Sequence, residues 1–159
     1  MSLFPLMFAL GAALSPLNSP LQHDSLQNGN GAVIEKTASG GAAAIVSRYR
    51  QQNGLGPVAD DAQLRQAAQF QADAMARADT LSHDVAGSPY SRLSSQGVRF
   101  RSYAENVSVG AASAEAVIGR WQRSPGHNQN LLKGDVRRVG IAVARSRSGR
   151  TYWAMVLTD

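Results

Sequence analysis

Residues 139–157 read VGIAVARSRSGRTYWAMVL, and this stretch is the strongest indication of fold class in the chain. Residues 139–145 and 151–157 are two short runs of apolar, β-branched and aromatic side chains. The polar segment SRSGR separates them, and a Gly-containing separator of this length predicts a β-hairpin. We therefore expect the chain to end in two antiparallel strands.

Helical patterns dominate the chain before this hairpin. Apolar residues recur at helical spacing from residue 41 to the Asn53-Gly54 pair, and again after Asp60 or Asp61, which can cap a second helix. Shorter helical segments are expected at YSRLSSQG, from Ser113 through Trp121, and at SPGHNQNLL, whereas residues 100–109 look like a strand. Helices come mainly first and antiparallel strands last, which predicts an α+β class with helices packed over a small sheet.

The N-terminal 40 residues differ in composition from the rest. Residues 4–14 form an apolar run too short to span a bilayer as a helix, and it matches the hydrophobic region of a signal peptide. Residues 21–40 are rich in Ser, Asn, Gln and Gly and are expected to be a flexible linker. We predict a signal peptide over residues 1–20, a single domain over residues 41–159, a secreted or periplasmic location, and no transmembrane span in the mature form.

Charge and cysteine content limit the function classes. The chain has 16 Lys and Arg against 11 Asp and Glu, a net charge of +5 that favours anionic partners. The basic residues are spread along the chain, so we expect no nucleic-acid partner. The absence of cysteine excludes disulfides, thiolate zinc sites and thiol nucleophiles. A denser basic stretch near the C-terminus is either an anion-binding patch or a solvated face; it contains Lys133, Arg137, Arg138, Arg145, Arg147 and Arg150.

Three residues with the chemistry of a site lie at ends or interruptions of predicted elements. His83 follows the second helix, His127 follows the third, and Glu105 interrupts an otherwise apolar strand. Burying a carboxylate in such a strand is unfavourable unless it is paired or ligated. Two imidazoles and a carboxylate form a three-ligand set for zinc or another divalent cation, and without metal an acid beside a histidine is a general acid/base pair.

Structural roles are open alternatives for the same residues. His83 could cap the preceding helix, His127 could bond to local backbone, and Glu105 could anchor a loop. The sequence contains no nucleophile elbow, no phosphate-binding glycine loop and no dinucleotide fingerprint.

Six segments together resemble one family. LSHD, YAENVSVG, the helix ending in Trp121, SPGHNQNLL, VGIAVA and TYWAMVL occur in the order typical of the CAP superfamily (SCP domain). That superfamily comprises cysteine-rich secretory proteins, antigen 5 and plant pathogenesis-related proteins, and its cysteine-free bacterial branch is the most similar. The resemblance implies a single-domain α-β-α sandwich, with a small antiparallel sheet between helices and a large open cleft.

The resemblance also implies which residues line that cleft. His83 matches the first histidine of the family, Glu105 and Asn106 match its "EN" motif, and His127 matches the histidine of its "GH" motif. Some members bind zinc or other divalent ions there, which makes His83, His127 and Glu105 the expected metal ligands. Eukaryotic relatives have a second acid three positions after the tryptophan, where this chain has Ser124.

Two functions remain at this stage. The first is a binding module that captures a lipid, a glycan or an anionic envelope component in the cleft, with or without a divalent cation. The second is a metal-assisted, peptidase-like hydrolase that uses the same residues. The missing second acid and the lack of a nameable activated nucleophile favour the binding module.

Overall fold

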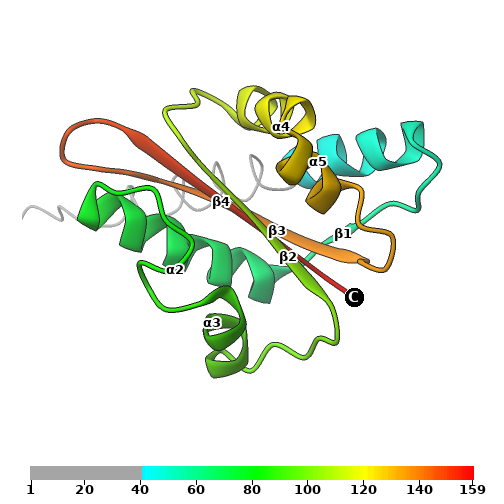
Figure 1. Ribbon diagram of the computed structural model, residues 1–159, viewed down its shortest axis with the longest axis horizontal. Coiled ribbons are helices and arrows are strands. Elements are labelled where there is room, and N and C mark those ends of the chain that lie inside the picture. The colour runs from blue at the N-terminus through cyan, green and yellow to red at the C-terminus, as the bar shows by residue number, and fades with distance from the viewer. Residues whose placement is uncertain (1–40) are drawn as a thin grey trace, which may run out of the picture.

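The computed structural model describes residues 41–159 (Figure 1). The predicted signal peptide and linker lie outside these residues. A helix covers residues 41–52. The elements that follow it are, in chain order, β1 (Ala59–Asp60), α2 (Ala62–Ala78), α3 (Pro89–Ser95), β2 (Tyr103–Val109), α4 (Ala114–Arg123), α5 (Pro125–Leu131), β3 (Arg138–Arg145) and β4 (Thr151–Thr158).

The sheet has the strand order β1-β3-β4-β2. The predicted C-terminal hairpin is its centre, with β3 and β4 paired antiparallel from Arg138↔Thr158 to Arg145↔Thr151. Strand β2 pairs antiparallel with the other side of β4, so it is an edge strand. The two-residue β1 pairs parallel with β3 and was not predicted, because Ala59-Asp60 is too short to show any alternation.

Helices cover both faces of this sheet. Figure 1 shows α2 and α3 on one side, and α4, α5 and the helix over residues 41–52 on the other. Each face has its own hydrophobic core, as expected for a three-layer sandwich. On the α2 side the core includes Leu64, Met75, Leu93, Val107 and Val156. On the α4/α5 side it includes Val46, Trp121, Leu131, Ile141 and Met155.

Helix α2 lies unusually close to the sheet. A β-carbon on Gly140 would lie 2.1 Å from the backbone carbon of Leu64, so only glycine permits this approach. Alanines on the inner face of α2 serve the same purpose, because Ala67, Ala68 and Ala72 are almost fully buried. The helix begins at the N-cap Asp61, whose carboxylate accepts hydrogen bonds from the next turn, as the sequence predicted.

A buried arginine fixes the opposite layer. Arg50 is fully buried at the end of the first helix, and its guanidinium donates to the backbone oxygens of Leu131, Lys133 and Val136. These carbonyls lie at and after the end of α5. The bonds therefore hold α5 against the first helix, and with it the candidate residue His127.

The α+β class and the single-domain α-β-α sandwich are confirmed. Three of the four strands form the expected antiparallel sheet, and only β1 is parallel to its neighbour. Within residues 41–159, no helix is long and apolar enough to cross a membrane.

Candidate functional site

The candidate site is built around two consecutive residues of the edge strand β2. Successive side chains of a strand point to opposite faces of the sheet. Glu105 therefore points toward the α2 and α3 layer, and Asn106 points toward the α4 and α5 layer. Both are buried, with 6% and 0% of their surface exposed. The family-like "EN" pair thus sends one polar group into each half of the sandwich.

Glu105 is held on both carboxylate oxygens. Its Oε2 forms a buried salt bridge with the Arg92 guanidinium, and its Oε1 lies 2.8 Å from His83 Nδ1. The side chains of Glu105 and Arg92 are only 3% and 4% exposed. The negative charge that looked costly in the sequence is therefore neutralised inside the protein.

Arg92 is the functional residue that the sequence analysis missed. It lies on α3, and besides Glu105 it donates to the backbone oxygens of His83 and Gly87. One guanidinium thus ties the loop that carries His83 to the strand that carries Glu105. The only available signal was indirect, since a carboxylate in a buried strand needs a cation and the chain offers 14 arginines.

The loop after α2 gives His83 a fixed orientation. The buried side chain of Gln71 donates to the carbonyl of Ser82, and Arg92 donates to the carbonyl of His83. A carboxylate only accepts hydrogen bonds, so His83 Nδ1 carries the proton shared with Glu105. In the neutral ring Nε2 is then an acceptor. The His83 side chain is 47% exposed, which leaves part of the ring accessible to a ligand.

A hydrogen-bond network of uncharged amide groups lies on the α4 and α5 side of β2. Asn106 donates to the backbone oxygen of His127 over 3.0 Å, and its own amide oxygen accepts from Asn130 over 2.8 Å. Asn130 also donates to the backbone oxygen of Glu105. These contacts attach α5 to β2 through amide groups alone, without any charge.

His127 lies in the first turn of α5 and contacts Ser124. Its Nδ1 lies 2.9 Å from the hydroxyl oxygen of Ser124, and its ring packs against Trp121 with centroids 6.5 Å apart. Burial lowers the pKa of His127 below its usual value, and repulsion from His83 lowers it further. His127 is therefore neutral at pH 7, and the two imidazoles lie within electrostatic range of each other.

The predicted residues meet in two groups rather than in one. His83 contacts Glu105 directly, whereas Asn106 and Ser124 contact His127. Within residues 41–159, no hydrogen bond joins His127 to Glu105. The groups are linked through the backbone of β2, where Asn130 donates to the backbone oxygen of Glu105 and to the side chain of Asn106.

The donor set does not fit the divalent cation that the family resemblance implies. Each carboxylate oxygen of Glu105 already accepts from a protein donor, one of them a permanent cation, so a metal ion could use only the lone pairs that remain beside those donors. Arg92 would also repel a divalent ion at that carboxylate. Across residues 41–159, no group of three or more His, Cys, Asp or Glu side chains is arranged to hold a metal ion.

The chain matches a known family over most of its described length. A sequence profile of the cysteine-rich secretory protein family (CAP) matches residues 44–157. YkwD, an uncharacterized protein of Bacillus subtilis (strain 168), is 29% identical over 106 residues, which cover 65% of this chain and 41% of YkwD. The chain thus spans less than half the length of that relative.

Solved structures share the fold. An extracellular protein containing a SCP domain from Bacillus anthracis str. Ames superposes with a TM-score of 0.73 at 22% identity, covering 86% of this chain and 45% of that chain. An outer surface protein from Borrelia burgdorferi gives a TM-score of 0.66 at 17% identity, covering 86% of this chain and 97% of that chain. At these identities the likeness establishes the fold alone.

Proposed function

Because the chain belongs to the cysteine-rich secretory protein (CAP) family, we propose that it is an extracellular module that binds an uncharged glycan of the cell envelope at the edge of β2. The extracellular and outer-surface descriptions of the two structural relatives support this location. The apolar run at residues 4–14 supports export in the same sense.

The observation that carries the proposal is the closed charge balance at Glu105. Arg92 and His83 occupy both carboxylate oxygens, so the site has no unpaired carboxylate to offer a cation. What remains accessible is the edge of the His83 ring, whose Nε2 accepts from a hydroxyl group when the ring is uncharged. A ligand rich in hydroxyl groups and free of charge satisfies such a site.

Three aromatic side chains that cluster around the start of β2 support a sugar ligand. The rings of Tyr90 and Phe100, and those of Phe100 and Tyr103, are 5.5 Å apart in edge-to-face geometry. Tyr103 shares a face of β2 with Glu105. Tyr90 lies on α3 with Arg92. Through Tyr103, the cluster lies on the same face of the sheet as the Arg92–Glu105 pair.

Tyr90 gives this cluster an exposed surface, since 60% of the residue is accessible. Sugar rings present apolar C–H faces and polar hydroxyl edges, so an aromatic face beside a hydrogen-bonding imidazole suits both. A bound sugar would stack on Tyr90 and donate a hydroxyl to His83. In this arrangement the protein binds the sugar by shape and hydrogen bonds, and no covalent bond of the ligand is cleaved.

The test is calorimetric titration of residues 1–159 with a hexamer of N-acetylglucosamine, which is neutral and soluble. We expect His83→Ala and Tyr90→Ala each to weaken binding about fivefold or more, the loss of one net hydrogen bond or ring contact. Phe70→Ala is the matched control, because Phe70 is an exposed aromatic residue on α2 that is no part of the aromatic cluster. Equal weakening by the control contradicts the site.

A second arm tests the metal. We expect the hexamer affinity to be the same in EDTA and in zinc chloride, because no step depends on a cation. A loss of affinity in EDTA that zinc restores would return His83, Glu105 and His127 to the role of metal ligands. Binding of neutral phospholipid vesicles in place of the hexamer would make the ligand a lipid and contradict the glycan.

A further inference from the structure

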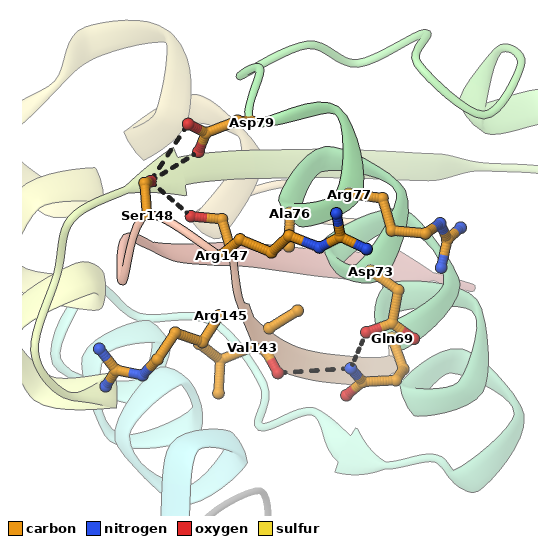
Figure 2. Close-up of a pocket in the computed structure, with 11 residues that line it drawn as sticks. Gln69, Asp73, Ala76, Arg77, Asp79, Val143, Arg145, Arg147 and Ser148 are labelled. Atoms are coloured by element: carbon orange, nitrogen blue, oxygen red, sulfur yellow. Dashed lines mark hydrogen bonds between the residues drawn. The ribbon is translucent and has the colours of Figure 1, made fainter.

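We propose a second binding site, beside the C-terminal half of α2, for a polyanion that carries repeated phosphate groups. The site is the pocket between the last turns of α2 and the β3–β4 hairpin, shown in Figure 2. It shares none of the residues of the glycan site, and the argument for it is independent of that proposal.

The pocket has a volume of about 740 Å³. Helix α2 forms one wall with Gln69, Asp73, Ala76 and Arg77, and the strand and hairpin form the other with Val143, Arg145, Arg147 and Ser148. Its size is within the range of about 300–1,000 Å³ that is usual for ligand sites.

The arginines of this pocket are the least engaged in the basic stretch. The side chains of Arg77 and Arg147 are exposed and have no hydrogen-bond or ion-pair partner within residues 41–159, and the side chain of Arg145 donates only to the backbone oxygen of Gly149 in its own hairpin. By contrast, Arg138 binds Asp61 and the C-terminal residue. Arg77 and Arg147 therefore have donor capacity to spare beside α2, whereas Arg145 points away from them in Figure 2.

The two pocket aspartates are already occupied. Asp79 binds Arg150 and accepts hydrogen bonds from Ser148 and Tyr152, and these contacts hold the pKa of that carboxyl well below its usual range. Asp73 accepts a hydrogen bond from Gln69. Three arginines line the pocket against two aspartates, and Arg150 outside the lining pairs with one of those acids, so the pocket has a positive excess.

The Asp79 network also makes the pocket a defined shape. Asp79 adopts a left-handed conformation, with φ of 49°, at the end of α2, and its contacts clamp the hairpin to the helix. Within the hairpin, backbone bonds join Ser146 to Arg150 and Gly149 to Ser146. The walls that carry Arg77 and Arg147 are thus held together before any ligand arrives.

The chemistry of the side chains identifies the ligand class. Guanidinium presents a planar fork of donors that matches phosphate oxygens in pairs. Arg77 and Arg147 line opposite walls, so a chain of phosphate groups laid in the pocket contacts both (Figure 2). A recess between a helix and a hairpin admits such a chain more readily than the flat surface of a bilayer.

The experiment measures binding of linear polyphosphate to the full chain by calorimetry in moderate salt. We expect the double variant Arg77→Gln/Arg147→Gln to weaken binding about tenfold, as the loss of two exposed ion pairs implies. The control is Arg48→Gln/Arg99→Gln, which removes the same charge from two exposed arginines without side-chain partners elsewhere in the described chain. We expect less than a twofold effect from the control.

A variant that removes a negative charge from the pocket provides a second test, because it should strengthen binding. Asp73→Asn takes a negative charge out of the pocket and should tighten polyphosphate binding severalfold, whereas Glu115→Gln on α4 should not. Equal losses in the two arginine double variants would overturn the site, because only net charge would matter. Arginine-dependent binding to phosphatidylglycerol vesicles without binding to polyphosphate would overturn the polymer in favour of a lipid headgroup.

Discussion

Strand β2 buries one polar side chain on each of its faces, and different chemistry satisfies the two side chains. At Glu105 the strand buries a charge and neutralises it with Arg92, and at Asn106 it buries an amide and satisfies it with Asn130 and a backbone oxygen. Each face also presents one histidine, His83 on the charged side and His127 on the neutral side. Adjacent residues of one edge strand therefore support two differently held imidazoles.

The two faces of β2 differ in what is left behind when a mutation removes one partner of the buried polar group. Taking one partner from a buried ion pair leaves an uncompensated charge, whereas taking one partner from an amide network leaves unsatisfied dipoles. The charged side should therefore be more sensitive to mutation than the neutral side. The predictions that follow test this ranking.

The largest effect is expected from Arg92→Met. Glu105 would keep its charge at 3% side-chain exposure without its partner, so the free energy of unfolding should fall by about 3–5 kcal/mol. Urea denaturation measures the loss. The exposed Arg48→Met is the control and should change stability by less than about 0.5 kcal/mol.

The companion variant for this pair is Arg92→Met/Glu105→Gln. Removing both charges should recover a large part of the stability lost in Arg92→Met, because the buried charge is gone. Finding that the double variant is as unstable as the sum of the two single variants would mean that the ion pair is not the source of the sensitivity.

Asn106→Ala should have a smaller effect. The variant removes the acceptor of Asn130 and the donor to the His127 carbonyl, and we expect a loss of about 1–3 kcal/mol for the unsatisfied groups. The same denaturation series measures it. A loss equal to or greater than that of Arg92→Met would reverse the ranking of the two faces.

The pH dependence of stability should distinguish the two histidines. The pKa of His127 in the folded state is below the unfolded value of 6.5, because burial disfavours the imidazolium. The unfolded chain then binds more protons as the pH falls, so stability is full above about pH 6.5 and declines as the pH falls from there toward the folded pKa. His127→Gln should remove this part of the decline between about pH 7.5 and pH 5.5, and an unchanged profile would contradict it.

Ser124→Glu should have the smallest effect and should act on His127 alone. A carboxylate on residue 124, whose hydroxyl now lies 2.9 Å from Nδ1, stabilises a nearby imidazolium and raises the pKa of His127 toward or above its usual value. Histidine titration by NMR measures the shift, and Ser124→Gln is the uncharged control. A shift of the same size in the control would show that the cause is not charge.

The sequence by itself determined the order of the helices and strands, except for the two-residue β1. Apolar periodicity located the helices and the C-terminal hairpin, because burial of one face imposes the same spacing wherever the element packs. It also identified His83, Glu105 and His127 as exceptional, because polar groups that interrupt apolar runs must find partners. The direct contact of His83 with Glu105 is consistent with that expectation.

Only the tertiary structure decided which partners those groups found. Arg92 is one arginine among 14, and nothing in its local sequence distinguishes it, because α3 meets β2 only after the layers have assembled. The basic stretch was contiguous in sequence, yet β3 separates Arg138 from Arg145 by a strand of eight residues, roughly 23 Å at 3.3 Å per residue. The C-terminal part of the basic stretch instead lines the same pocket as Arg77 of α2. Local patterns follow from backbone geometry over a few residues, whereas charge pairing depends on distances that the folded chain alone sets.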